Sequence, residues 1–282
     1  MEIKKLLVGP DLYVVATPIG NIEDITVRAL RTLKSVDYIA CEDSRITNKL
    51  LDHYKIKTPM LVYNDHCNEH DRNKIINLIT KGNSVALVSD AGTPLISDPG
   101  YKLVRLAQQK QIKVTICPGA SSVISALVVS GLPTNSFAFI GFLSTKQISR
   151  KKQLAAIKTE NRTIIIFESA NRLVKTLEDI HTVLGDKLVS VIRELTKIYE
   201  EVKTAKVSKV IEYYQQYPPK GEIVILIEAS THNNRDHATT IDDQLKHLLQ
   251  EHSVKDSVEV IAHNFHITKK EIYKRALLLL GK

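Results

Sequence analysis

The sequence lacks the features that mark disulfide-stabilised, zinc-binding and membrane-spanning proteins. Among its 282 residues the cysteines are Cys41, Cys67 and Cys117, and none belongs to a CxxC pair. This odd number and this spacing argue against a disulfide framework and against a cysteine-based zinc site. No apolar run approaches the length of a bilayer span, and the short apolar stretches before Pro10 do not form an export signal. We therefore expect a soluble, cytoplasmic protein in a reducing compartment.

Common phosphate-binding motifs are absent as well. The sequence has no GxxxxGKS or GxxxxGKT segment, and no GxGxxG segment follows a predicted strand. These absences argue against NTP hydrolysis and against ordinary dinucleotide binding. The hydrophobic content of 43% is enough to fill the cores of about two ordinary domains and a small appended unit.

Positive charge is in excess, with a formal net charge of +8 and an isoelectric point near 9.2. Such a balance makes nucleic acid a candidate partner through phosphate attraction, although many basic proteins bind none. The charge is concentrated in two segments, residues 144–162 and the C-terminal end. Their basic residues are Lys146, Arg150, Lys151, Lys152, Lys158 and Arg162 in the first segment, and Lys269, Lys270, Lys274 and Arg275 in the second.

An α/β pattern runs through most of the chain. Strand-like runs such as LYVVA and SVALVS alternate with segments of 3.6-residue apolar spacing, which predicts an N-terminal α/β domain over residues 1–143. One helix is predicted from Ile22 to Val36, with Asn21 as its N-cap. The pattern resumes after the basic segment, which predicts a second α/β domain over residues 144–230 with a basic linker at 144–162. The polar segment 230–240 is typical of a linker.

The C-terminal residues 240–282 have the pattern of short amphipathic helices. The final two are separated by a turn at His266–Thr268, and Thr268 with Glu271 matches a capping box. This spacing predicts a helix-turn-helix unit whose last helix contacts a nucleic-acid backbone through its lysines. An ordinary amphipathic helix with a solvated lysine face is the alternative.

Four loops that follow predicted strands are rich in Gly, Pro, Ser, Thr and Asp. In α/β sheets ligands bind beyond the carboxyl ends of strands, where glycine permits close backbone approach. Neutral loops rich in amides suit a zwitterionic ligand that carries a nucleoside. The four loops are ATPIGN at Ala16–Asn21, SDAGTPLISDPG at Ser89–Gly100, PGASS at Pro118–Ser122 and FESANR at Phe167–Arg172.

These loops, together with CEDSR at Cys41–Arg45 and RELTK at Arg193–Lys197, occur in the order of a known family. From about Leu12 to Ala229 the chain resembles the 16S ribosomal RNA (cytidine-2'-O)-methyltransferase branch of the tetrapyrrole methylase superfamily. The C-terminal unit resembles the helix-turn-helix appendage of that branch. The resemblance implies two α/β domains with S-adenosyl-L-methionine in the cleft between them, usually in a homodimer. It also implies 2'-O-methylation of a cytidine in 16S rRNA, of the cytidine-1402 type, within the 30S subunit.

The resemblance also implies site residues. Members that act on tetrapyrroles usually have a Gly-Asp-Pro triplet where this chain has Ser89-Asp90-Ala91 before Gly92-Thr93-Pro94, a departure that favours the RNA branch. Carried over by position, the cofactor contacts are Ile19, Asp90, Gly92, Thr93, Ser121, Ser122, Phe167 and Glu168. The expected RNA contacts are Arg45, Arg150, Lys151, Lys152, Arg172, Lys269, Lys270, Lys274 and Arg275.

No general base is identified by the sequence. A 2'-hydroxyl is a poor nucleophile while protonated, so a proton acceptor would accelerate its methylation. Glu42, Asp43, Asp65 and His66 are candidates, and each also has a structural interpretation. Arg45, Arg172 and Arg193 could contact phosphate or form ion pairs with Glu42, Glu168 and Glu194. No metal is expected, because the short cluster of His66, Cys67 and His70 does not provide a recognised ligand set.

Other functions remain open at this stage. One is methylation of a tetrapyrrole precursor; the basic linker and the C-terminal helices argue against it. Another is a non-catalytic helix-turn-helix protein that binds nucleic acid and uses its α/β body only to sense a ligand.

Overall fold

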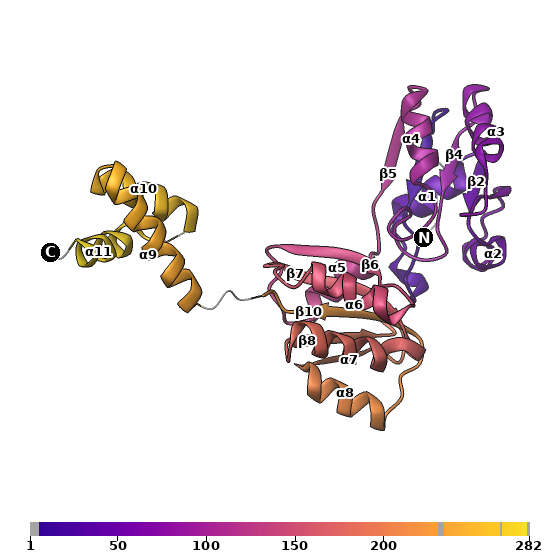
Figure 1. The fold of residues 1–282 in the computed structure, drawn as a ribbon. Coiled ribbons are helices and arrows are strands. Elements are labelled where there is room, and N and C mark those ends of the chain that lie inside the picture. Colours follow the sequence, from indigo (N-terminus) through magenta and orange to yellow (C-terminus); the bar gives the residue numbers. More distant parts are fainter. Residues whose placement is uncertain (1–5, 231–233, 266, 281–282) are drawn as a thin grey trace. The chain divides into compact units, whose positions relative to one another are not determined.

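The computed structural model describes residues 6–230, 234–265 and 267–280. The chain divides into two compact units, Met1–Glu228 and Ala229–Lys282. The first unit contains the two α/β layers and the second is helical, as Figure 1 shows. Within the described ranges, no helix is both long and apolar enough to span a bilayer.

The first sheet of the larger unit is parallel and buried on both faces. Its strand order is β3-β2-β4-β1-β5, with every pair in parallel register. The strands are β1 (Leu12–Val15), β2 (Tyr38–Cys41), β3 (Met60–Val62), β4 (Val85–Leu87) and β5 (Val114–Cys117). Parallel neighbours require crossover connections, which put helices on both faces. Helices α1 (Val27–Ser35) and α2 (Ser44–His53) pack on one face, and α3 (Glu69–Thr80) and α4 (Tyr101–Gln109) pack on the other.

The predicted helix from Ile22 to Val36 is interrupted. Asn21 caps a short 3-10 turn at Ile22–Asp24, where its side chain accepts a hydrogen bond from the Glu23 amide. Thr26 then caps α1 by accepting from the amide of Ala29. Because Thr26 satisfies one of the free amides at the start of α1, the chain can change direction between the two helical segments.

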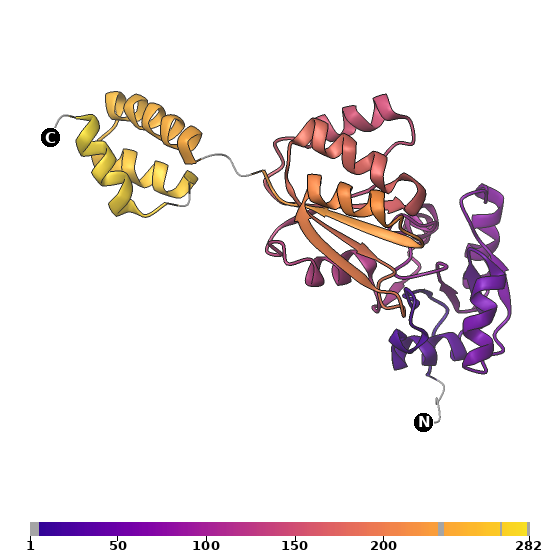
Figure 2. The same cartoon turned by 90° about the horizontal axis from the view of Figure 1, so that it is seen from below.

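The second sheet mixes parallel and antiparallel pairs. Its order is β6-β7-β10-β8-β9; β6 and β7 are parallel, and the other neighbours are antiparallel. The strands are β6 (Phe137–Phe142), β7 (Thr163–Ser169), β8 (Leu188–Arg193), β9 (Glu201–Lys206) and β10 (Glu222–Ile227). Helices α6 (Gln147–Ala156), α7 (Leu173–Leu184) and α8 (Val207–Gln216) pack on one face, and α5 (Ser122–Val129) packs on the other (Figure 2). A 3-10 turn at Ala170–Arg172 precedes α7.

The second sheet differs from the prediction in two strands. The predicted N-terminal domain, residues 1–143, included β6, but β6 pairs with β7 and belongs to the second sheet. Strand β9 was not predicted, because half of its sequence EVKTAK is charged and its half-buried residues alternate with exposed ones. Such alternation is expected of an edge strand with one solvated face.

The basic segment 144–162 is not a linker, because most of it forms helix α6. Arg150 on this helix is only 4% exposed, and its Nη2 lies 2.6 Å from Oδ2 of Asp179 on α7. The guanidinium also faces the carbonyl oxygens of Ser144 and Thr145. The prediction that Arg150 contacts RNA is therefore wrong, since its charge is used inside the domain. The neighbouring Lys151 and Lys152 are more accessible.

The smaller unit consists of α9 (Asn234–Glu251), α10 (Val254–Phe265) and α11 (Lys269–Leu279). Helix α9 begins inside the segment predicted as a linker, because residues 234–240 contain neither glycine nor proline to stop it. Ile241, Leu245, Ile261 and Ile272 share one core. Thr268 caps α11 by accepting from the Glu271 amide, which is one of the two hydrogen bonds of the predicted capping box, while His266 of the predicted turn lies outside the described residues.

Candidate active site

The loops that follow β1, β4 and β5 meet at one edge of the first sheet, because these strands are neighbours in the order β4-β1-β5. Thr17 and Gly92 exchange backbone hydrogen bonds of 2.8 and 3.1 Å, which joins the first loop to the second. The Thr93 hydroxyl donates to the Ala120 carbonyl at 3.1 Å, which joins the second loop to the third. The three predicted ligand loops therefore form one interlocked surface.

Backbone conformation makes this close approach possible. Gly92 has a φ of +80°, and a Cβ atom at this position would lie 3.1 Å from Cγ2 of Ile19. Leu95 and Ser97 in the same loop also have positive φ values, +75° and +66°. Non-glycine residues adopt this region at an energetic cost, and such strain gathers at functional sites. The loop Ser89–Gly100 is thus held in a specific shape by its neighbours.

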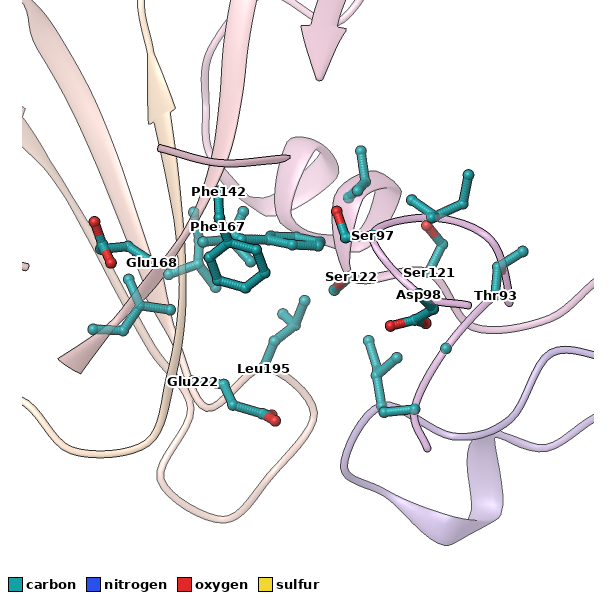
Figure 3. Close-up of a pocket in the computed structure, with 18 of the residues that line it drawn as sticks. Thr93, Ser97, Asp98, Ser121, Ser122, Phe142, Phe167, Glu168, Leu195 and Glu222 are labelled. Atoms are coloured by element: carbon teal, nitrogen blue, oxygen red, sulfur yellow. The ribbon is translucent and has the colours of Figure 1, made fainter. Parts of the chain in front are cut away.

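A cleft of about 340 Å³ lies between these loops and the second sheet (Figure 3). The first sheet's side contributes Ile19, Gly92, Thr93, Asp98 and the serines at the start of α5. The second sheet contributes Phe142 and Phe167, whose rings meet edge to face with centroids 5.5 Å apart. The complete lining consists of Ile19, Ala91, Gly92, Thr93, Ile96, Ser97, Asp98, Ser121, Ser122, Val123, Phe142, Phe167, Glu168, Ser169, Ile192, Leu195, Gly221, Glu222, Ile223 and Val224.

Most of the predicted cofactor contacts line this cleft. They are Ile19, Gly92, Thr93, Ser121, Ser122, Phe167 and Glu168. Asp90 does not line it and instead borders an adjacent hollow of about 200 Å³. Its Oδ1 accepts a hydrogen bond from the Asp43 amide at 3.0 Å. The Glu168 carboxylate is buried against Thr176 and Arg172, 2.6 and 3.2 Å away. These contacts give it a structural role within the second α/β layer.

Asp98 is a cleft carboxylate that the sequence analysis missed (Figure 3). Burial raises its pKa, and the negative charges of Asp90 and Asp65 raise it further, against a hydrogen bond from Ser89. Burial likewise raises the pKa of Glu42, followed by the charges of Asp90, Asp98 and Asp65. These carboxylates therefore repel one another at this end of the site. Their repulsion favours the binding of a cationic ligand and makes each carboxylate a better proton acceptor. The sequence signal that could have identified Asp98 is the second Ser-Asp pair of SDAGTPLISDPG, Ser97-Asp98.

The four predicted base candidates lie outside the lining of the cleft. Asp43 caps α2, and hydrogen bonds from Arg45 lower its pKa to about 2, which makes it a weak base. Asp65 and His66 are exposed in the loop before α3. Of the four, Glu42 and Asp65 interact electrostatically with Asp98. Across the described ranges, no cluster of three His, Cys, Asp or Glu residues could hold a metal ion.

The arginines of the motifs form local ion pairs. Arg45 pairs with Asp43, not with Glu42, and its side chain is 87% exposed. Arg172 pairs with Glu168, and its Nη2 donates to the Leu143 carbonyl at 2.8 Å. Arg193 pairs with Glu201 on β9 at 3.0 Å instead of Glu194. These contacts support the structural interpretation of Arg172 and Arg193.

The loop between β8 and β9 forms part of the cleft rim through Leu195. The Asn21 amide donates to Thr196 Oγ1 at 3.1 Å, which ties this loop to the first ligand loop. Lys197 lies 2.9 Å from carboxylate oxygens of both Glu194 and Glu222. These contacts fix the loop beside the cleft; the sequence analysis named the RELTK motif but did not predict these contacts.

Comparison with known proteins gives consistent relatives. The chain matches the family described as Tetrapyrrole (Corrin/Porphyrin) Methylases over residues 11–242. A Rickettsia prowazekii protein named ribosomal RNA small subunit methyltransferase I is 44% identical over 271 residues, or 95% of this chain and 96% of that protein. The Synechocystis protein of the same name is 41% identical over 273 residues, covering 95% and 98%.

Solved structures share the fold at low identity. A diphthine synthase has a TM-score of 0.60 at 16% identity, covering 78% of this chain and 90% of that chain. A uroporphyrin-III C-methyl transferase from Thermus thermophilus, complexed with S-adenyl homocysteine, has a TM-score of 0.54 at 18% identity, covering 77% and 96%. At such identities the likeness concerns the fold alone.

Proposed function

This chain belongs to the tetrapyrrole methylase family, and from that membership we propose that it is an S-adenosyl-L-methionine-dependent methyltransferase of small-subunit ribosomal RNA. We propose the ribose 2'-hydroxyl of a cytidine in 16S rRNA as the acceptor and the cytoplasm as its location. The observation that carries the proposal is the cleft between the sheets, which is lined by the interlocked ligand loops on one side and by the second sheet on the other. The choice of ribosomal RNA as substrate rests on the names of the relatives that align over nearly the whole chain.

The cleft suits the proposed methyl donor in size and chemistry. Its volume falls in the range of about 300–1,000 Å³ that is usual for small-molecule sites. Phenylalanine and isoleucine side chains offer apolar walls for an adenosyl group, and the hydroxyls of Thr93, Ser121 and Ser122 offer hydrogen bonds. Asp98 provides negative charge for a cationic ligand. Ile19, Gly92, Thr93, Ser121, Ser122 and Phe167 would hold the donor.

When bound, the donor would supply a methyl group from a sulfonium, whose neutral thioether is a good leaving group. The protein must then mainly align the ribose oxygen and exclude water from the cleft. The hydroxyl proton must also be accepted, and we assign this role to Asp98. Among the carboxylates that line the cleft, Glu168 is buried against Arg172, and Glu222 is paired with Lys197. Asp98 remains as an acceptor that faces the cleft.

RNA would be held by exposed basic residues outside the cleft. Arg45 and Lys152 in the larger unit retain this role in the proposal, as do the lysines of α11 in the smaller one. Lys151 does not, because it is half buried and its Nζ lies 3.5 Å from Oδ1 of Asp179. Each phosphate contact of this kind releases counterions, so binding should weaken as salt rises.

We also propose a homodimer, formed through an apolar surface at the edges of both sheets. Strands β5 and β6 are edge strands, and α5 lies between them in the sequence. The exposed side chains here include Ile116 (49%), Ile124 (49%), Val128 (71%) and Ile140 (37%). Apolar surface of this kind is commonly covered by a partner.

The direct test is mass spectrometry of 16S rRNA nucleosides from a strain that lacks the gene, with and without a plasmid copy. The proposal expects 2'-O-methylcytidine to disappear and to return with the wild-type copy but not with an Asp98→Asn copy. An unchanged 2'-O-methylcytidine level in the deletion strain would remove the proposed substrate. Turnover of a porphyrinoid by the purified protein would favour a tetrapyrrole substrate, and RNA binding without methyl transfer would favour the non-catalytic alternative.

A further inference from the structure

We infer that the groove between α10 and α11 binds an unpaired segment of RNA, with one base stacked on Tyr273. The inference rests on the proposed action on RNA and names the form of RNA that the smaller unit recognises. The groove has a volume of about 520 Å³. The described residues that line it are Lys255, Val258, Glu259, Lys269, Lys270, Tyr273 and Lys274.

Charge in the groove is strongly positive. Its lining holds four lysines and one glutamate, and Lys269 forms an ion pair with that glutamate, Glu259. Lys255, Lys270 and Lys274 are exposed, and none has an ion pair with another described residue. Three ammonium groups therefore remain for phosphates. They come from both helices, so a backbone lying along the groove could meet them in succession.

Arg275 does not add to this charge. Its Nη1 lies 3.7 Å from Oδ1 of Asp242 on α9, so the side chain is directed toward the packing of α11 on α9. The basic residues predicted on α11 thus divide between two roles. Lys270 and Lys274 face the groove, while Arg275 holds the helix in place.

Tyr273 supplies an apolar surface among these charges. It is 49% exposed, whereas Ile272 and Ala276 beside it on α11 are fully buried in the core of the unit. Val258 on α10 is 5% exposed and forms part of the groove wall. An aromatic ring between lysines is the usual combination in proteins that bind single strands, where bases stack on rings and the backbone follows the charge.

The shape of the site favours an unpaired strand over a duplex. In a duplex the bases are stacked on one another, so the ring of Tyr273, which lies in a hollow, could not reach a base face. The major groove of A-form RNA is also too deep and narrow to admit a helix. The helix-turn-helix arrangement therefore has a different use here from that in major-groove recognition of DNA.

The test is fluorescence anisotropy with the full chain and a labelled single-stranded oligocytidylate of about 12 nucleotides, a length within the usual range of single-strand sites. We expect Tyr273→Ala to weaken binding about ten-fold or more, and Tyr273→Phe, which keeps the ring, to bind within about two-fold of wild type. Tyr217→Ala is the matched control, since Tyr217 is 55% exposed in the larger unit; its affinity should be unchanged. Circular dichroism verifies that each variant is folded.

A second measurement tests the lysines and the choice of strand. Replacing Lys255, Lys270 and Lys274 with alanine should reduce the slope of log K against log salt by about 2, at about 0.7 per phosphate contact for single strands. A blunt-ended RNA duplex of matched length, which has no unpaired loop, should bind Tyr273→Ala and wild type equally.

Several results would overturn the inference. They are unchanged single-strand affinity of Tyr273→Ala, an equal loss for Tyr273→Phe, or an equal loss on the duplex. Methyl transfer to 30S subunits, measured in parallel with a tritiated donor, separates the two proposals. If the wild type transfers methyl groups but Tyr273→Ala binds the single strand as the wild type does, only the inference about the groove fails. If the wild type transfers no methyl groups, the proposed function fails.

Discussion

Replacement of Asp98 by asparagine tests the centre of the proposed chemistry. Asparagine has nearly the same shape and can still form a hydrogen bond with Ser89, but it cannot accept a proton at neutral pH. Loss of a general base typically lowers the rate about 10²–10⁴-fold. Glu42, Asp65 and Asp90 interact electrostatically with Asp98 and could accept the proton in part. We therefore expect kcat to fall by about 10², the lower end of that range.

The pH dependence gives this prediction a second readout. The pKa of Asp98 is raised, and only the ionised form can accept a proton. Wild-type kcat should therefore rise with pH through that pKa, while Asp98→Asn should show no such rise. Because folding favours the protonated form, ionised Asp98 opposes folding, and stability is lost as pH rises through its raised pKa. The Asp98→Asn variant should thus melt no lower than wild type at pH 7.

The assay is transfer of a tritiated methyl group to 30S subunits, with donor affinity measured separately by calorimetry. Glu222→Gln is the matched control, because Glu222 also lines the cleft but is 75% exposed and paired with Lys197. Its kcat should stay within about three-fold of wild type, since the pair is solvated and weak. A kcat for Asp98→Asn close to wild type, or a complete loss of donor binding, would refute the assignment of Asp98 as proton acceptor.

Three other changes probe the framework around the site. Asp179→Ala leaves Arg150 charged and buried, so the free energy of unfolding in urea should fall by about 3–5 kcal/mol. Glu160→Ala breaks the more accessible pair with Arg162 and should cost about 0–1 kcal/mol; similar losses for the two variants would contradict the burial argument. Gly92→Ala should lower donor affinity in calorimetry, because its Cβ would press on Ile19, while Gly82→Ala, with no atom within 4 Å, should not. Val128→Glu should shift the sedimentation coefficient to that of a monomer, and an equal shift for the exposed Ile148→Glu on α6 would argue against the proposed dimer surface.

Local sequence patterns predicted the strands and helices well because burial in a parallel sheet leaves nearly continuous apolar runs. They did not predict sheet membership. Strand β6 looks like another strand of the first domain, and only its pairing with β7 assigns it to the second sheet. Strand β9 was missed because half of its residues are solvated.

The loops that line the cleft could be predicted better than the contacts of their side chains. Glycine and small hydroxyl residues after strands indicated where the backbone approaches a ligand, and these loops do line the cleft. Whether a charged side chain faces the ligand depends on its partners in space. Asp90 is directed to the Asp43 amide, Asp98 faces the cleft, and Arg150 is held by Asp179. None of these partnerships can be read from neighbouring residues in the sequence.

The paired amides of Thr17 and Gly92 have a practical consequence. They bond to each other across 75 positions of sequence, so neither can exchange its hydrogen with solvent unless the two loops separate. Deuterium uptake at these two sites would therefore gauge opening of the loops directly. Comparison of deuterium uptake with and without a bound nucleoside would show how far the loops are ordered in the apoprotein and how far the ligand orders them further.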